Sequence, residues 1–448
     1  MSADQGPGDK RARRRATPSR EVTSRGGGPE RAVLVGTQRA DSGVFTGAES
    51  LGELERLADT AGVQVAATAL QTVRRINPAT FIGSGKVEDV HALIQQNAAN
   101  VAVFDDSLSP AQQRNLERAL QVKVVDRSQL ILDIFAQRAH SLAGKLQVEL
   151  AQLEYLLPRL TRQWQHLSRL GGGVGTRGPG ETQLEVDRRR VRERIAALRR
   201  RVREVARTRG LHRQSRAAVP YPTVALVGYT NSGKSTLMNR LTAAGVLVED
   251  KLFATLDPTV RRLALPSGAT ALLIDTVGFI NKLPHGFVDA FKSTLEEVQT
   301  ADLLLHVIDA SNPHAAEQAR IVEQVLQELG ADATARLTVL NKMDAVAPGA
   351  APALGDGPRC AISARTGTGI ADLLAAIDTA LQSGRERIHL RFPASRGDLV
   401  ARLHRNGTVL HEEYQDGQVD IVALVTPKLA GQVRKAAKRS ELSEAADI

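Results

Sequence analysis

The stretch TVALVGYTNSGKSTLMNRL, residues 223–241, decides the fold of this 448-residue chain. Its first five residues are typical of a buried strand, and they lead directly into G-x-x-x-x-G-K-S, from Gly228 to Ser235, and then into a helical pattern. Backbone N–H groups of such a loop surround phosphates; Lys234 would reach the β- and γ-phosphates, and the Ser235 hydroxyl would bind Mg²⁺. The stretch therefore predicts a P-loop at the end of a strand in an α/β domain.

Three further motifs follow in the chain order of a GTPase. The apolar run ALLID ends at Asp275, which can hold a Mg²⁺-bound water, and the N–H of Gly278 can sense the γ-phosphate. The motif N-K-M-D ends at Asp344, whose carboxylate can accept two hydrogen bonds from guanine, whereas adenine offers neither donor. The tripeptide S-A-R begins at Ser363, where a backbone N–H can reach the guanine O6. Together these motifs predict that the chain binds and hydrolyses GTP.

The segment between the P-loop and the second motif predicts a switch. A threonine of LFATLDPTVRR, residues 252–262, must complete the Mg²⁺ sphere when the γ-phosphate is present, and spacing alone leaves both Thr255 and Thr259 open. GTPases often place a glutamine after the glycine of D-x-x-G to orient the attacking water, but this chain has Phe279. We therefore expect slow basal hydrolysis. In the P-loop, Asn231 can supply a ligand to a monovalent cation such as K⁺.

The region before the P-loop predicts two structures in succession. Residues 31–140 alternate between strand and helix patterns, which predicts a small parallel α/β subdomain. Residues 141–216 carry two heptad seams joined by a short loop, which predicts a long antiparallel helical hairpin. Pro158 should kink the first helix, and Arg188 interrupts the second seam. The seam residues are Leu146, Leu150, Leu153, Leu157, Leu160, Trp164 and Leu167, then Leu184, Val191, Ile195, Leu198, Val202 and Val205.

The loop of the hairpin, residues 171–180, contains six glycines and the spacing G-x-G-x-x-G. A dinucleotide turn must follow a strand and open a helix, whereas these glycines follow a leucine-seam helix, so we exclude nucleotide binding there. Residues 188–216 hold thirteen arginines and two acidic residues, which cannot pair internally. This surplus favours a surface that faces RNA phosphates. A flexible connector is the alternative interpretation of the glycines.

Composition limits what the rest of the chain can be. No apolar run is long enough for a membrane span, the N-terminus has no apolar signal region, and Cys360 is the only cysteine. These features favour a cytoplasmic protein, which we expect to be a monomer. Residues 1–30 predict a disordered basic tail, 217–384 the GTPase domain and 385–448 a small α+β domain.

Segments in every part of the chain carry a resemblance to a known family. They are INPATFIGSGKVEDV (76–90), LSPAQQRNLER (108–118), LILDIFAQRA (130–139), GKLQVELAQLEYLLPRL (144–160), GGGVGTRGPGETQLEVDRRR (171–190), VGYTNSGKSTLMNRL (227–241), LFATLDPTVRR (252–262) and DTVGFI (275–280). With these segments the chain resembles HflX, the ribosome-associated GTPase of the Obg–HflX group.

The resemblance implies binding to the large ribosomal subunit, splitting of stalled or idle ribosomes under stress, and approach of the glycine-rich tip to ribosomal RNA near the peptidyl-transferase region. It also implies that Thr255 is the switch threonine. The family's N-terminal domain has been linked to adenine nucleotides and RNA remodelling, but the chain has no second P-loop there.

These motifs define the predicted site residues. A GTP-gated scaffold for another partner, with incidental hydrolysis, remains the alternative function. The residues predicted to act on the reacting phosphate are Lys234, Thr255 and Gly278, and those predicted to hold Mg²⁺ are Ser235, Thr255 and, through water, Asp275. The residues predicted to bind GTP are Gly228, Tyr229, Thr230, Asn231, Ser232, Gly233, Lys234, Ser235, Phe253, Ala254, Thr255, Leu256, Asp257, Asp275, Thr276, Val277, Gly278, Asn341, Lys342, Met343, Asp344, Ser363, Ala364 and Arg365. The residues predicted to contact RNA are Gly172, Gly173, Gly175, Arg177, Gly178, Arg188, Arg189 and Arg190.

Overall fold

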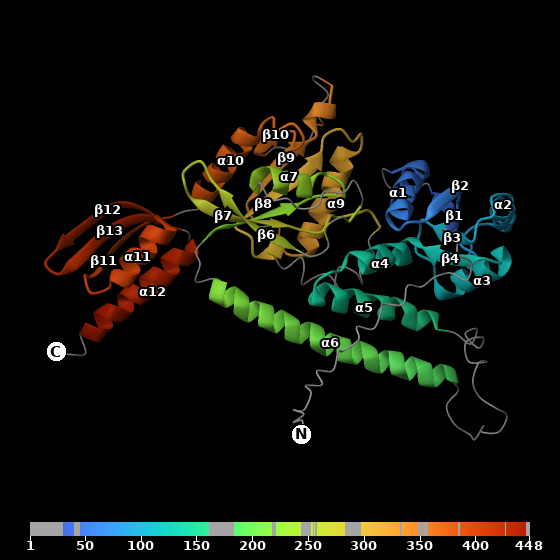
Figure 1. Cartoon of the computed structure of the whole chain (residues 1–448), viewed down its shortest axis with the longest axis horizontal. Coiled ribbons are helices and arrows are strands. Elements are labelled where there is room, and N and C mark those ends of the chain that lie inside the picture. The colour runs from blue at the N-terminus through green and yellow to red at the C-terminus, as the bar shows by residue number, and fades with distance from the viewer. Residues whose placement is uncertain are drawn as a thin grey trace, which may run out of the picture.

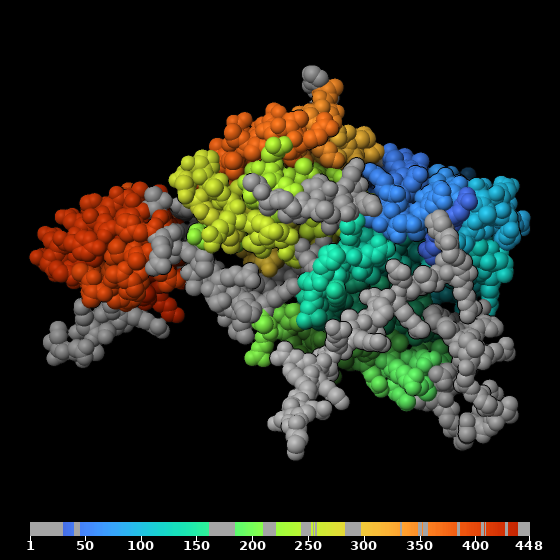
Figure 2. Space-filling view, viewed as in Figure 1, coloured from blue at the N-terminus to red at the C-terminus, as the bar shows by residue number. Residues whose placement is uncertain are grey.

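The described part of the chain folds around three separate β-sheets and a pair of packed helices (Figure 1). We call the predicted GTPase domain the G domain. In the space-filling view the N-terminal domain, in blue, adjoins the G domain, in yellow to orange, whereas the C-terminal domain, in red, forms a separate lobe (Figure 2). The computed structural model describes residues 30–39, 45–160, 183–216, 221–242, 252–253, 255, 258–282, 297–331, 334–347, 352, 357–383, 386–425 and 427–444.

The N-terminal domain is a four-stranded parallel sheet in the order β2-β1-β3-β4, with helices on both faces. Alternate residues of β1 lie on opposite faces of the sheet and belong to two different cores. Leu34 packs with helices α1 and α4, whereas Val35 packs with α2 and α3. Ser109 caps the start of α3 and Thr46 caps the start of α1, and each hydroxyl accepts a hydrogen bond from the backbone N–H three residues later. The elements are β1 (Arg31–Gln38), α1 (Gly47–Thr60), β2 (Gln64–Thr72), α2 (Ser84–Gln96), β3 (Val101–Phe104), α3 (Pro110–Leu120), β4 (Lys123–Asp126) and α4 (Arg127–Arg138).

The helical pair consists of α5 (Leu142–Leu156), continued by the 3₁₀ turn η1 (Leu157–Arg159), and α6 (Gln183–Arg216). Its apolar seam joins Leu146 and Leu150 of α5 to Ile195 and Leu198 of α6. Two ion pairs flank this seam, one between Glu149 and Arg194 and one between Glu154 and Arg199.

Two predicted irregularities of the pair have clear structural outcomes. Pro158 lies in η1, so the regular helix ends before it rather than continuing with a kink. Arg188, the predicted flaw in the seam, donates from its guanidinium to the Leu160 carbonyl at 2.7 Å. The seam residues Trp164 and Leu167 and the glycine-rich tip lie outside the described residues.

The G domain contains a six-stranded sheet in the order β10-β9-β8-β5-β7-β6, in which only β6 runs antiparallel to its neighbour. The P-loop strand β5 lies between β8 and β7, so the loop emerges at the middle of the carboxyl edge. The elements are β5 (Thr223–Val227), α7 (Lys234–Thr242), β6 (Thr259–Ala264), β7 (Thr270–Asp275), β8 (Leu303–Asp309), α9 (Ala315–Glu328), β9 (Arg336–Asn341), η4 (Met343–Ala345), β10 (Arg359–Ala361) and α10 (Ile370–Ser383).

The C-terminal domain is a three-stranded antiparallel sheet in the order β11-β13-β12 that packs with two helices. Strand β13 alternates buried and half-buried residues, the pattern of a sheet with one covered face. Among the described residues, no helix is long and apolar enough to cross a membrane. The elements are β11 (Glu386–Pro393), α11 (Gly397–Asn406), β12 (Thr408–Gln415), β13 (Gln418–Val425) and α12 (Pro427–Glu444).

Candidate functional site: a GTP pocket on the G domain

Two glycines shape the phosphate loop, because a larger side chain at either position would have no room. A Cβ on Gly228 would lie 2.2 Å from the Val307 carbonyl oxygen, and one on Gly233 would lie 2.3 Å from the Asn341 side-chain nitrogen. Gly233 also has φ of +92°, which favours glycine. Any larger residue at either position would force the loop away from the sheet.

Lys234 is the buried cation of this loop. Its Nζ donates to the carbonyl oxygens of Gly228 at 3.1 Å and Tyr229 at 2.7 Å. Burial lowers the pKa of Lys234 to about 8, although the Asp275 carboxylate acts in the opposite direction. Burial also raises the pKa of Asp275, against the effect of Lys234 and two hydroxyl groups. A buried ammonium at the centre of the loop is placed to meet phosphate oxygens.

Three oxygen-bearing side chains converge beside the loop. The Asp275 Oδ2 accepts from the hydroxyls of Ser235 at 2.7 Å and Thr255 at 3.0 Å, and these two hydroxyls lie 2.9 Å apart. Thr259, the other candidate for the switch threonine, is instead the first residue of β6. The Asp275 Oδ1 is buried without a hydrogen-bond partner among the described residues. This set of hard oxygen donors fits the requirements of Mg²⁺.

The side chains predicted to read the base form a connected network. Asn341 donates to the Ser232 carbonyl oxygen at 2.9 Å and accepts from the Ala364 N–H at 3.0 Å, which ties β9 to the P-loop. The Ser363 hydroxyl donates to the Asp344 Oδ1 at 2.6 Å, and this bond, with the nearby Arg365 charge, holds the pKa of Asp344 below its usual range. Asp344 therefore presents an ionised carboxylate, the acceptor that guanine requires.

These parts enclose one pocket of about 390 Å³. The structure places the predicted residues Gly228, Tyr229, Ser232, Asp275, Val277, Met343 and Ser363 around this pocket rather than on its wall, and Ala254, Leu256 and Asp257 lie outside the described residues. The wall consists of Thr230, Asn231, Gly233, Lys234, Ser235, Thr236, Phe253, Thr255, Thr276, Gly278, Asn341, Lys342, Asp344, Ala345, Ala364 and Arg365.

Phe279 occupies the place where a water-orienting glutamine often stands. Its ring is only 3% exposed and packs in the core between the G domain and the N-terminal domain. Its backbone bridges to the P-loop, since its N–H donates to Gly228 at 3.1 Å and its carbonyl accepts from Thr230 at 2.7 Å. The side chain has no group that can hydrogen-bond water, and its packing holds the segment after Gly278 against the P-loop.

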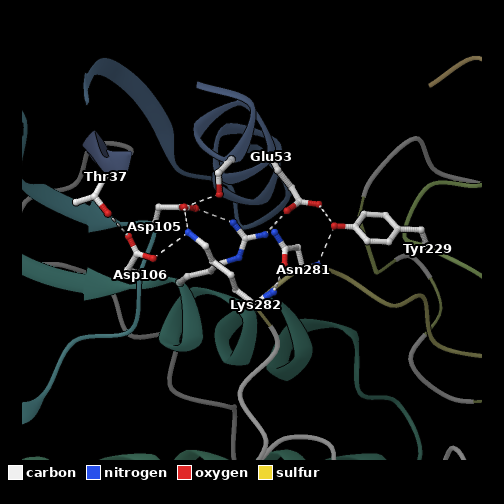
Figure 3. A network of polar contacts seen from close by, with 9 residues as sticks. Thr37, Glu53, Asp105, Asp106, Tyr229, Asn281 and Lys282 are labelled. Atoms are coloured by element: carbon white, nitrogen blue, oxygen red, sulfur yellow. Dashed lines mark hydrogen bonds and ion pairs between the residues drawn. The ribbon is translucent and has the colours of Figure 1, made fainter. Parts of the chain in front are cut away.

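A polar network joins this site to the N-terminal domain (Figure 3). The Tyr229 hydroxyl donates to Glu53 at 2.6 Å and accepts from the Asn281 N–H at 2.8 Å. The Glu53 carboxylate also accepts from the buried guanidinium of Arg127. Tyr229 thus points away from the pocket and connects the P-loop, the segment after D-x-x-G and helix α1.

Lys282 makes a second link across the same junction. Its ammonium contacts the carboxylates of Asp105 and Asp106 at the carboxyl end of β3. Burial raises the pKa of Asp105, but the charges of Arg127 and Lys282 outweigh this and keep that pKa below its usual range. On the opposite side of the site, the Phe253 ring packs edge-on against Phe135 with centroids 4.6 Å apart. Both segments that flank the phosphate site therefore contact the N-terminal domain.

Models of known protein families match the N-terminal domain, the helical region and the G domain of this chain. The N-terminal domain matches the family model described as GTP-binding GTPase N-terminal over residues 48–136, and the helical region matches GTP-binding GTPase Middle Region over 138–216. The G domain matches the model described as 50S ribosome-binding GTPase over 223–342. The chain is 49% identical over 388 residues to the GTPase HflX of Caldanaerobacter subterraneus subsp. tengcongensis, a match that covers 86% of this chain and 90% of that protein. The chain belongs to the HflX family of GTPases.

A second curated relative agrees with this assignment. The GTPase HflX of Escherichia coli K12 is 46% identical over 378 residues, covering 83% of this chain and 89% of that protein. A GTP-binding protein of Sulfolobus solfataricus, solved in complex with GDP, is 23% identical, with a TM-score of 0.43 over 79% of this chain and 99% of that one. The predicted family, the P-loop GTPase fold and GTP hydrolysis as the activity of this HflX-family chain are confirmed.

The predicted RNA-contacting residues divide into two groups. Of the arginines, Arg188 is tied to Leu160, whereas Arg189 and Arg190 have side chains that are 54% and 71% exposed. The other predicted positions, Gly172, Gly173, Gly175, Arg177 and Gly178, lie outside the described residues.

Several residues of the site were not predicted from the sequence. Thr236 and Ala345 line the pocket, and both directly follow predicted residues, so extension of each motif by one position would have found them. Glu53 reaches the P-loop residue Tyr229 from the N-terminal domain, and Arg127 binds Glu53 from within that domain. Neither residue has a local signal, because they lie 176 and about 100 residues away from Tyr229 along the chain.

Proposed function

We propose that this chain is a GTP hydrolase that binds the large ribosomal subunit and splits stalled or idle ribosomes, under stress. Basal turnover is slow and the ribosome stimulates it. The observation that carries the proposal is the attachment of a GTP pocket to a long arginine-rich helix in one chain of the HflX family. Phe279 supports slow basal turnover, because it cannot orient the attacking water and a partner must then complete the site.

Helix α6 supplies the surface for RNA in this proposal. Its exposed arginines Arg192, Arg200, Arg201, Arg203 and Arg207 extend along one rod, with Glu193 and Glu204 as the acids beside them. A surface with such an excess of positive charge binds phosphates and releases counterions. The glycine-rich tip, residues 171–180, then approaches ribosomal RNA near the peptidyl-transferase region. We further propose that the protein acts in the cytoplasm as a monomer.

The nucleotide roles in the proposal follow the geometry of the pocket. Lys234 contacts the β- and γ-phosphates, Ser235 and Thr255 bind Mg²⁺ directly, and Asp275 binds it through water. Mg²⁺ would supply charge neutralisation between the phosphates. Gly278 senses the γ-phosphate, and Asp344 with the 363–365 loop reads guanine. Asn231, at φ of +60° on the pocket wall, supplies a ligand for K⁺.

One experiment separates this function from a GTP-gated scaffold for another partner. The protein is pelleted with ribosomes through sucrose in a non-hydrolysable GTP analogue or in GDP, at rising salt. We expect co-sedimentation only with the triphosphate analogue, and loss of binding as salt rises, because many phosphate contacts are broken. A protein that stays in the supernatant in both nucleotides would exclude the ribosomal function.

A second experiment tests the role of the tip. Replacement of residues 171–180 by a serine-rich linker should leave GTP affinity unchanged and impair ribosome splitting. Loss of nucleotide binding in this variant would instead show that the glycines belong to a nucleotide site. GTP turnover, measured with and without purified large subunits, gives the matching test of stimulation.

A further inference from the structure

Arg240 joins the P-loop helix to the loop that carries the third base-reading motif. It lies near the end of α7, six residues after Lys234 in the sequence, and its side chain is exposed. Its Nε donates to the Ala364 carbonyl oxygen at 3.0 Å, and its Nη2 donates to the Arg365 carbonyl oxygen. One planar guanidinium therefore binds the oxygens of two successive peptide groups.

These two bonds fix the direction of the corresponding N–H groups. In a trans peptide the C=O and the N–H point in opposite directions, so an Ala364 carbonyl turned to Arg240 directs the Arg365 N–H away from it. Arg365 lines the base end of the pocket. The Ser363 N–H donates to Thr368 and the Ala364 N–H donates to Asn341, so in the described chain the Arg365 N–H is the amide of this tripeptide that remains for a base oxygen.

The second peptide group leads to the carboxylate that reads guanine. The Arg365 carbonyl is held by Arg240, and the N–H of the same peptide, which belongs to Thr366, donates to the Ser363 hydroxyl at 3.1 Å. That hydroxyl donates in turn to the Asp344 Oδ1 at 2.6 Å. The Arg240 guanidinium thus supports both groups that would meet the base, the Arg365 N–H and the Asp344 carboxylate.

We propose that Arg240 is a positioning residue for guanine selectivity, which holds the 363–365 loop so that its amide and Asp344 meet the base together. The inference rests on the proposed assignment of Asp344 and this loop to guanine. Arg240 acts on the base and not on the phosphates, because among the described residues its hydrogen bonds go to the two carbonyls of this loop. Its loss should change which nucleotide binds and leave the rate of the chemical step intact.

The test measures displacement of a fluorescent GDP analogue by GDP, IDP and ADP from Arg240→Ala, Arg240→Lys and the unaltered protein. For Arg240→Ala we expect binding of GDP and of IDP, which shares the O6 and N1–H groups, to weaken about tenfold, or about 1.4 kcal/mol. This is near the lower limit for a hydrogen bond from a charged donor, since Arg240 is exposed. The weak binding of ADP should not change, so the GDP-to-ADP selectivity falls about tenfold.

Kinetics and controls distinguish positioning from a structural role. In steady-state hydrolysis the KM for GTP should rise about tenfold while kcat stays within about twofold, and Arg240→Lys should recover part of the selectivity because lysine can reach one carbonyl. Arg320→Ala on α9, an exposed arginine that is not part of the pocket wall, is the matched control and should resemble the unaltered protein. Equal weakening of GDP and ADP with a lowered melting temperature would overturn the proposal, as would unchanged selectivity.

Asp344→Asn separates failure of this inference from failure of the proposed site. If Asp344→Asn lowers guanine selectivity and Arg240→Ala does not, Arg240 has no positioning role and the site assignment stands. If Asp344→Asn leaves selectivity unchanged, the guanine site itself is assigned wrongly.

Discussion

Removal of one oxygen atom at Tyr229 should weaken the coupling between the N-terminal domain and the G domain. The hydroxyl donates to the Glu53 carboxylate at 2.6 Å and accepts from the Asn281 N–H at 2.8 Å, and the residue is only 4% exposed. Burial, followed by the Glu53 charge, raises the pKa of Tyr229 well above its usual range, so the hydroxyl keeps its proton and stays a donor. Tyr229→Phe preserves the ring and removes both bonds.

The cost of this substitution follows from the two partners. A hydrogen bond to a charged group contributes about 1.5–3 kcal/mol, and a half-buried N–H without a partner costs about 1 kcal/mol more, so the sum is about 2.5–4 kcal/mol. In the Tyr229→Phe variant the Glu53 carboxylate keeps its ion pair with Arg127, so the loss of stability should not exceed this range. A stability change of this size lowers the melting temperature by roughly 10 °C in domains of about 150–250 residues.

Scanning calorimetry tests this expectation. The transition of the N-terminal and G domains should shift down by that amount and become broader, because the lost contact lies between two domains that Lys282 and Phe253 still join. Tyr414→Phe is the matched control, since its hydroxyl also donates to a glutamate, Glu412 at 2.8 Å, but the residue is 61% exposed. A double-mutant cycle with Glu53→Gln should be non-additive by about 1 kcal/mol or more. If Tyr229→Phe melts with the same profile as Tyr414→Phe, the buried bond does not couple the domains.

Three further predictions concern the G domain. Lys234→Ala should lower GTP turnover by about 10²-fold or more, because it removes the cation that meets the transferring phosphate, and undiminished turnover would contradict the P-loop assignment. Asp344→Asn should weaken GDP binding by about 10²-fold through loss of two charge-assisted hydrogen bonds, as measured by displacement titration; equal affinity would remove its base-reading role. Burial, followed by the charges of Arg336 and Lys234, lowers the pKa of His306 to about 4. The unfolded chain therefore binds a proton at a higher pH than the folded chain, and the free energy of unfolding of the G domain should fall by about 3 kcal/mol between pH 6.5 and pH 4. Urea unfolding midpoints check this slope, and His306→Leu should flatten it.

The parts of the site whose residues lie close together in the chain could be predicted from the sequence. The P-loop could be predicted because its glycines, lysine and serine lie within eight residues of a strand end, and each is required by the backbone path or by the phosphates. The helix seam could be predicted because its period is fixed by helix geometry. The cap at Ser109 follows from the same kind of short-range rule.

Contacts between distant segments could not be predicted in this way. The pairing of Lys282 with Asp105 joins positions 177 residues apart, and neither residue differs from an ordinary surface charge in the sequence. The choice of Thr255 over Thr259 depends on the path of the chain around Asp275, which spacing does not determine. Arg188 interrupts the seam in the sequence, but the structure supplies it with a free carbonyl where α5 ends.

The unbroken length of α6 has a mechanical consequence. The helix is 34 residues long, so it spans about 51 Å, and only residues 217–222 separate its end from the strand that leads into the P-loop. A tilt of about 10° at that end would carry the opposite end through about 9 Å. A helix of this length is therefore a lever arm, because a small tilt at the end near the P-loop is amplified into a displacement of several ångströms at the far end.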